Sequence, residues 1–451
     1  GMEKRERLGS RLGFIMLSAG CAIGCGNVWK FPWMCGQNGG GSFMLIYVIC
    51  LIVLGLPAMI MEFSVGRAAQ TSPLYMYRKL SGGRGKWNLW GIVCLIGNIA
   101  LIAFYAVVSG WILYYFVKFL TGQNQDFGFE KMITTPSVNV TYLLFTLLIA
   151  FVILSFHLQG GLERITKYMM SALIVLMLVL AVHSFTLPGA GEGLSFYLIP
   201  HFSKITGSVV VGAMNQAFFT LSVGMGGMAI FGSYIGKDHT LTGEAVRVAG
   251  LDTLVALMAG LVIFPSCFAF GVEPGSGPGL VFITLPSVFN EMPFGQLWAV
   301  LFFVFMTFAA LSTVIAVFEN IMSFTMDQWG TPRKKACLVN GVLLAVLSMP
   351  CVLGFNVLAG FTVPGIGDIQ AIEDFLVSNN ILPWGGLLLV LFCTRKSGWG
   401  WEGFLAEADT GSGLKFPRWA RGYVTYVIPV GMLIVFAMGY APIIAKWAGL
   451  G

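Results

Sequence analysis

Glycines interrupt an apolar segment near the N-terminus, and the residues around them could bind an ion. Gly20, Gly24 and Gly26 fall in an apolar stretch that begins at Leu12. Glycine lowers helix propensity by about 1 kcal/mol relative to alanine, so three close together favour a break. Inside a membrane, broken backbone is tolerated where it lines a cavity in the protein. Its freed carbonyls can bind a cation, and the next helix N-terminus can face an anion. The alternative is an unbroken helix whose small residues pack against a neighbour.

A second interruption of the same kind lies in mid-chain, where Asn215–Gly227 reads NQAFFTLSVGMGG. Paired interruptions at corresponding positions of two halves indicate a transporter site between inverted repeats. Two acids, Glu62 and Asp252, also stand inside apolar segments. A carboxylate within a membrane span is energetically costly, so each acid is a candidate functional residue. For Asp252 the alternative is a protonated carboxyl that is only hydrogen-bonded.

The elements that carry these residues are membrane spans. Of the 451 residues, 57% are hydrophobic and only 10% are charged, whereas soluble domains carry about 25% charged residues. A span needs about 20 apolar residues. The sequence therefore predicts an all-α polytopic membrane protein with eleven spans, at residues 12–35, 41–66, 88–120, 139–156, 165–185, 210–233, 243–271, 296–326, 336–354, 369–394 and 422–447.

The spans are expected to form one bundle, residues 1–451. Spans one and six carry the interruptions and begin successive groups of five, which predicts two inverted five-helix repeats with broken helices 1 and 6. The first repeat would cover residues 12–185 and the second residues 210–394, and 422–447 would be an additional helix.

The basic residues predict the orientation. Most of the 26 Lys and Arg residues lie before span one and after spans two, four, six, eight and ten. By the positive-inside rule that side is cytoplasmic, so the N-terminus is inside and the C-terminus outside. No cleavable signal peptide is evident. We expect a multi-pass plasma-membrane protein, located in the inner membrane if the cell is bacterial.

The sequence argues against an enzyme. The four histidines, at 157, 183, 201 and 239, are scattered and form no HExxH pair. The nine cysteines form no CxxC pair and most lie in apolar segments, where they read as packing residues. The net charge of +6 lies mainly in loops on one side of the predicted membrane and does not indicate nucleic-acid binding.

Three motifs resemble the neurotransmitter:sodium symporter family, in its prokaryotic amino-acid-transporting branch. Gly20–Pro32, GCAIGCGNVWKFP, followed by Asn38–Gly41, is similar to the first-helix signature of that family. Phe218–Ser222 with Gly224-Met-Gly226 resembles its sixth helix, and Leu187–Pro200 resembles the loop before it. The resemblance covers residues 5 to 330 and implies sodium-driven symport by alternating access.

The resemblance implies two sodium ions with oxygen ligands. One site would use the carbonyls of Gly20 and Ile23 with Ala309, Ser312 and Thr313, which share one helix face at i, i+3 and i+4. The alternative for the two hydroxyls is bonding to their own helical turn. A carboxylate offsets the charge of the ion in the other site. That site would use Ala22, Asn27, Thr220 and Asp252.

The same resemblance implies an amino-acid pocket. Tyr105 would donate a hydrogen bond to the substrate carboxylate, and Phe219 would close over the substrate. Relatives that carry monoamines have an aspartate where Gly24 stands, so glycine leaves room for a carboxylate. The remaining lining has no charged side chain, which favours hydrophobic or aromatic amino acids over glycine or proline. It comprises Ala22, Gly26, Leu101, Val108, Thr220, Ser222, Met225 and Val317.

The resemblance also assigns gates. Outside, Lys30 takes the place of an arginine, and a lysine lacks the bidentate fork. Its expected partner is Asp374, with Glu373 and Asp368 as competitors. The expected cytoplasmic gate consists of Arg5, Asp327 and Tyr234.

Chloride is not expected to be required. Chloride-dependent relatives carry asparagine at the position of Asp252 and serine at that of Ala256. A permanent carboxylate replaces the anion here. Glu62 resembles the acid that hydrogen-bonds the unwound part of helix six, with direct ion binding as the alternative.

Two other functions stay open at this point. A transport-inactive receptor would keep the same amino-acid site, and a channel would have an open pore instead of two gates. The expected partners are the substrate and the lipid bilayer, with no nucleic acid.

Overall fold

The computed structural model describes residues 23–123, 128–156, 158–234 and 236–450. Within these ranges nearly all regular structure is helical, and β structure is limited to two isolated bridges. Nine helices there are long and apolar enough to cross a membrane. The prediction of an all-α polytopic membrane protein is confirmed.

The long helices reproduce nine of the eleven expected spans. Several contain a stretch of π-helix (η), whose turns are wider than those of an α-helix. In chain order they are α3–η2–α4 (Gly41–Cys50, Leu51–Gly55, Leu56–Ala69), α6 (Asn88–Leu120), α8 (Pro136–Ser155), α9 (Gln159–Phe185), α13 (Leu241–Phe270), α15 (Gly295–Trp329), α16 (Arg333–Leu353), α17–η4–α18 (Ile369–Asp374, Phe375–Ile381, Leu382–Thr394) and α20–η5–α21 (Ala420–Gly422, Tyr423–Val427, Ile428–Trp447).

The sixth expected span is split into α11 (Gly207–Leu221) and α12 (Gly227–Tyr234). Between them the backbone is not helical. The interruption predicted from the glycines at residues 224 to 227 is therefore present. The shorter connecting helices are α5 (Pro73–Ser81), α7 (Phe129–Thr134), α10 (Ala190–Leu198), the 3₁₀ helix η3 (Phe202–Lys204), α14 (Leu280–Glu291) and α19 (Trp401–Ala408).

The first expected span differs from the prediction in the part that the structure describes. Gly24 and Gly26 lie in a π-helix, η1 (Ile23–Lys30), which continues directly into α2 (Phe31–Gln37). The backbone is therefore wound at these two glycines and not broken. A Cβ on Gly26 would lie 3.0 Å from the Cα of Thr220, so this glycine lets η1 approach α11 closely. Gly20 lies outside the described residues.

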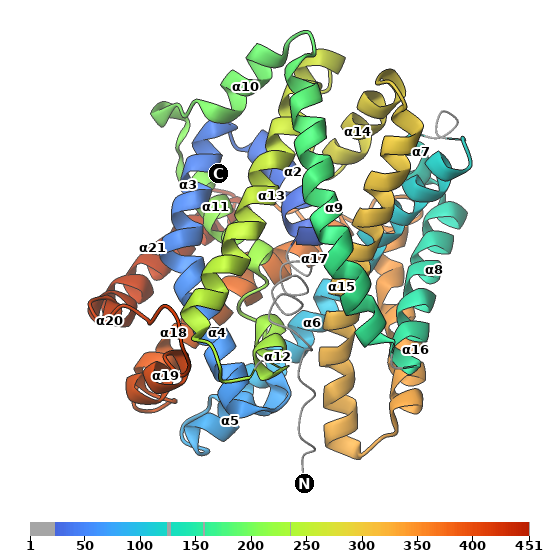
Figure 1. Ribbon diagram of the computed structural model, residues 1–451. Coiled ribbons are helices and arrows are strands. Elements are labelled where there is room, and N and C mark those ends of the chain that lie inside the picture. The colour runs from blue at the N-terminus through green and yellow to red at the C-terminus, as the bar shows by residue number, and fades with distance from the viewer. Residues whose placement is uncertain (1–22, 124–127, 157, 235, 451) are drawn as a thin grey trace.

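The packing places the broken span at the centre of the bundle. α6 packs along α15, α4 packs against α12, and α3 packs against α11. α10 and α14 lie at one end of the molecule, and α5 and α19 at the other (Figure 1). The bundle therefore surrounds the non-helical residues with long helices, far from either end.

Apolar side chains also cover outward faces of the helices. Val339, Val342 and Val346 lie at i, i+3 and i+7 on α16 and are each more than half exposed. An exposed apolar stripe of this kind is unusual in a soluble protein and fits a lipid-facing surface.

Candidate functional site

The break between α11 and α12 is built from residues that tolerate left-handed backbone. Ser222 has a φ of 56°, Gly224 of 122° and Gly226 of 80°. Residues other than glycine rarely adopt such backbone φ values. A Cβ on Gly224 would also lie 2.2 Å from the carbonyl oxygen of Leu382. The two glycines therefore make the break possible, and it leaves backbone N–H and C=O groups in need of partners.

Glu62 supplies three of those partners. Its side chain is fully buried on α4. Oε1 accepts hydrogen bonds from the N–H groups of Gly224 and Gly226, both at 3.0 Å, and Oε2 accepts one from Met228 at 3.1 Å. The carboxyl group thus binds the unwound backbone and the first turn of α12.

Asn98 holds the other side of the same segment. Its Nδ2 donates to the carbonyl of Met225 at 3.0 Å and to the carbonyl of Cys94, on its own helix, at 2.7 Å. α6 is therefore tied to the break through a carbonyl, whereas α4 is tied to it through N–H groups.

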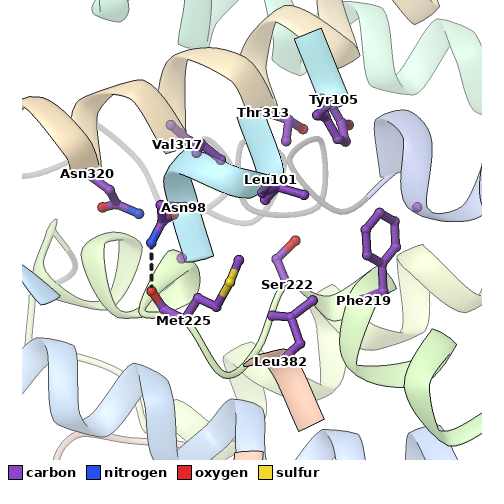
Figure 2. A pocket seen from close by; sticks show the side chains of 13 residues that line it. Asn98, Leu101, Tyr105, Phe219, Ser222, Met225, Thr313, Val317, Asn320 and Leu382 are labelled. Carbon is purple, nitrogen blue, oxygen red and sulfur yellow. Dashed lines mark hydrogen bonds between the residues drawn. The ribbon is translucent and has the colours of Figure 1, made fainter. Parts of the chain in front are cut away.

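A pocket lies against this break, enclosed by η1, α6, α11, α15 and α18. Its volume is about 30 Å³. Tyr105 and Phe219 lie at one end, Asn98 and Asn320 at the other (Figure 2). The described residues that line it are Gly26, Asn98, Leu101, Tyr105, Phe219, Ser222, Met225, Gly227, Thr313, Ala316, Val317, Asn320 and Leu382.

Seven of the residues expected to line a substrate pocket do so, and two are placed elsewhere. Val108 is fully buried on α6 about one turn beyond Tyr105, outside the lining. The Thr220 hydroxyl donates to the carboxylate of Asp252 instead. Ala22 lies outside the described residues, and Gly24 lies in η1.

The sequence reasoning missed two polar residues of the pocket, Asn98 and Asn320. A helical signal for both was available. Asn98 stands three and seven residues before Leu101 and Tyr105, and Asn320 stands three residues after Val317, so each shares a face with an expected pocket residue. Leu382 gave no such signal, because its span lies beyond residue 330, where the resemblance to the family motifs ends.

The carboxylate of Asp252 gathers two of its expected neighbours. Thr220 Oγ1 lies 2.9 Å from both carboxylate oxygens, and Asn27 Nδ2 donates to Oδ1 at 2.8 Å and to the backbone carbonyl of Asp252 at 3.1 Å. Asp252 and Thr220 are fully buried, and so is Asn27, whose Oδ1 has no hydrogen-bond partner. An acid beside an unpartnered amide oxygen is a donor set that fits a hard cation.

The second expected cation site is described only in part. Ala309, Ser312 and Thr313 are buried on one face of α15, and α15 packs against η1. The Ser312 hydroxyl donates to the carbonyl of Phe308 on its own helix at 2.9 Å, which is the alternative to ion binding given above. Ile23 begins η1, and Gly20 lies outside the described residues. Across the described residues, no cluster of three His, Cys, Asp or Glu side chains suggests a transition-metal site.

Lys30 and Asp374 form the expected ion pair. Nζ lies 2.6 Å from Oδ1 of Asp374 and 2.8 Å from Oγ of Ser378, and both charged side chains are buried. Nζ also lies 4.1 Å from the ring centroid of Phe219, within reach of a cation–π contact. The pair therefore connects η1 and α17 through a lysine that touches the pocket residue Phe219.

The expected cytoplasmic gate is described incompletely. Arg5 lies outside the described residues, and Tyr234 is the last residue of α12. Asp327 is exposed near the end of α15. Burial raises the pKa of Tyr75 on α5, and the charge of Asp327 raises it further.

Comparison with known proteins places the chain among transporters. The model of the sodium:neurotransmitter symporter family matches residues 5–125 and 127–446. A Bacillus subtilis protein, YhdH, described as an uncharacterized sodium-dependent transporter, is 36% identical, and the match covers 96% of this chain and 97% of that protein. A sodium-dependent transporter of Haemophilus influenzae is 32% identical, with 96% and 98% covered. The crystal structure of MhsT in complex with L-phenylalanine matches with a TM-score of 0.90 at 36% identity, covering 96% of this chain and 99% of MhsT.

Proposed function

The chain belongs to the sodium:neurotransmitter symporter family, and from this premise we propose that it imports hydrophobic or aromatic L-amino acids with sodium by alternating access. It is a multi-pass membrane transporter and not an enzyme. The observation that carries the proposal is the pocket at the break between α11 and α12, which has a tyrosine at one end and apolar walls.

The proposed substrate lies with its carboxylate toward Tyr105 and η1. Tyr105 is 3% exposed and lines the pocket beside Gly26. Gly24, two residues earlier in η1, adds no negative side chain that would repel a carboxylate. Leu101, Met225 and other apolar side chains surround the rest, and none of the described lining residues is charged. MhsT, whose structure holds L-phenylalanine, supports this substrate class.

Two sodium ions are proposed to accompany the substrate. One is bound by Asn27, Thr220 and Asp252, together with the backbone at Ala22. The carboxylate offsets the charge of this ion in a buried site. The other is bound by Ser312 and Thr313 with the carbonyls of Gly20, Ile23 and Ala309. Both sites adjoin η1, so sodium binding favours the conformation in which η1 completes the amino-acid pocket.

The proposed outer gate is the pair of Lys30 and Asp374, which lies directly beyond Phe219. Arg5 and Asp327, with Tyr234, are proposed to close the opposite, cytoplasmic side. The end of the molecule that carries α5, α19 and the turn between α15 and α16 is rich in basic residues, which supports a cytoplasmic location for that end (Figure 1).

The proposal is tested in two steps on the purified chain. Binding of leucine, phenylalanine and tryptophan should require sodium and should not be supported by potassium. In proteoliposomes, an internal load of unlabelled amino acid should drive counterflow of the labelled amino acid. Full binding in potassium alone would contradict the sodium sites, whereas sodium-dependent binding without counterflow would indicate a receptor.

A further inference from the structure

Asn320 places an unpartnered amide at the end of the pocket that is farthest from Tyr105. Its side chain lines the pocket and is 5% exposed, and neither Nδ2 nor Oδ1 has a hydrogen-bond partner. Leaving both atoms of a buried amide without partners is unfavourable. A pocket occupant that pairs with them therefore gains binding energy that a purely apolar occupant does not.

The surroundings direct this amide toward the occupant. Asn320 follows Thr313, Ala316 and Val317 on one face of α15, all of which line the pocket. The other amide at this end, Asn98, has both Nδ2 hydrogens committed to backbone carbonyls. Figure 2 shows the two amides together on one side, with Tyr105 and Phe219 on the other.

The walls between the two ends are mainly apolar, and the hydroxyls of Ser222 and Thr313 are their polar groups. Leu101, Met225, Val317 and Leu382 lie between the amide end and the tyrosine end, in contact with the same cavity (Figure 2). The pocket thus has a polar group at each end and hydrophobic sides. A matching side chain is apolar along its length and polar at its tip.

We propose that Asn320 hydrogen-bonds the polar tip of the substrate side chain and makes this transporter prefer tyrosine, and next tryptophan, over phenylalanine and leucine. This inference rests on the proposed function, since it needs the carboxylate at the Tyr105 end. A tyrosine hydroxyl donates to Oδ1 and accepts from Nδ2, whereas the indole N–H of tryptophan donates to Oδ1 only. Phenylalanine leaves both amide atoms unpaired, and sites of this kind discriminate strongly against an analogue that lacks the hydrogen-bonding group.

The test is sodium-dependent competition binding on the full chain with tyrosine, tryptophan, phenylalanine and leucine. We expect tyrosine to bind at least about ten-fold more tightly than phenylalanine. In Asn320→Leu, which replaces the amide by an apolar group of similar size, this ratio should fall to about one while phenylalanine affinity is retained. Asn320→Ser replaces the amide by a hydroxyl, which can still form a hydrogen bond, and should give an intermediate ratio.

Ser323→Ala is the matched control on the same helix. The Ser323 hydroxyl donates to the carbonyl of Glu319 at 2.8 Å and does not line the pocket, so the affinity order should stay that of the wild type. Equal affinities for tyrosine and phenylalanine in the wild type, or an unchanged ratio in Asn320→Leu, would overturn the inference and leave the proposed function standing. Absence of sodium-dependent binding for all four amino acids would overturn both.

Discussion

The buried polar side chains at the centre of this protein mainly hold backbone in place. Glu62 receives three N–H groups and Asn98 donates to a carbonyl of the same unwound segment. Gln216 likewise donates from α11 to the carbonyl of Gly26 in η1 at 2.6 Å. Non-helical backbone in a membrane is stable only when such partners are present. The broken span therefore depends on side chains from other helices.

Glu62→Gln tests this dependence. In the carboxylate, both oxygens accept hydrogen bonds from backbone N–H groups. A glutamine has only one acceptor oxygen, so its NH₂ group would face one of these N–H groups and could not accept from it. An unsatisfied buried N–H costs about 1–3 kcal/mol, so we expect a lower thermal unfolding midpoint in detergent and weaker sodium-dependent amino-acid binding. Glu402→Gln, at an exposed residue of α19, is the control and should change neither. Wild-type stability and binding in Glu62→Gln would contradict the supporting role.

Asp252 leads to a prediction about chloride. Its carboxylate is fully buried and hydrogen-bonded by Thr220 and Asn27, so under the proposed function it supplies a permanent negative charge beside a sodium ion. Ala256, one turn further along α13 and also buried, cannot donate a side-chain hydrogen bond to an anion. We expect sodium-driven uptake to be unchanged when gluconate replaces chloride.

The double variant Asp252→Asn with Ala256→Ser removes the charge and adds a hydroxyl. Uptake should then require chloride, or be lost if the site is too small for the anion. Asp252→Asn alone should lose uptake in both media. Wild-type uptake that collapses without chloride would contradict the charge assignment but not the fold.

At the scale of elements, four spans in the described part of the chain share one feature. In each, a π-helix continues into an α-helix that has a proline at its second position. Pro32, Pro57, Pro383 and Pro429 each stand second in the α-helix after η1, η2, η4 and η5. Proline lacks an N–H and cannot donate to the carbonyl four residues earlier. In three of the four spans a side chain donates to that carbonyl. The pairs are Tyr423 to Val53, Tyr440 to Asn379 and Arg395 to Thr425.

Tyr423→Phe should therefore destabilise the bundle. The hydroxyl of Tyr423 reaches from η5 to η2, so its loss leaves the carbonyl of Val53 with less hydrogen bonding and loosens the contact of the C-terminal span. We expect a loss of about 0.5–1.5 kcal/mol, measured as a lower unfolding midpoint in detergent. Tyr426→Phe, at an exposed tyrosine one turn away, should leave the midpoint unchanged. Equal effects of the two variants would show that the hydroxyl contact does not stabilise the packing.

At the scale of the whole molecule, span positions could be predicted because they depend on apolar length alone. The span expected at residues 88–120 coincides with α6 (Asn88–Leu120). The break after Leu221 was also predictable, since glycines at positive φ leave a local signal. The helical winding of η1 was not predictable from the sequence. Gly26 allows a close approach to Thr220, and only the tertiary structure shows this contact.

The pocket was predictable to a similar degree. Leu101 and Tyr105 were expected from family motifs, but Asn98 was missed although it lies on the same face of α6. Leu382 comes from a span interrupted by acids and a proline, where no motif could be aligned. Leu382 directly follows the π-helix η4, which contacts the distant helix α21 through the hydrogen bond from Tyr440 to the carbonyl of Asn379. The roles proposed for the ion ligands and gates remain predictions.

The ion pair of Lys30 and Asp374 makes a prediction about the whole transport cycle. It is buried and joins η1 to α17 beside Phe219, and under the proposed function it stabilises the conformation that is closed to the outside. Removing one partner of a buried pair costs about 3–5 kcal/mol because the other charge is left uncompensated. In Asp374→Asn the closed conformation should be depopulated. Counterflow should fall at least about ten-fold, whereas sodium-dependent binding from the outside is retained.

Two further variants separate the charge from the position. Lys30→Met combined with Asp374→Leu removes both charges and keeps apolar volume, which is often neutral for a buried pair. Counterflow should then recover relative to Asp374→Asn, even though the pair is absent. Asp368→Asn changes a nearby acid that caps α17 through a hydrogen bond from Ala371 at 2.9 Å, and asparagine caps comparably, so transport should not change. If Asp374→Asn transports like the wild type, closure depends on helix packing and not on this pair.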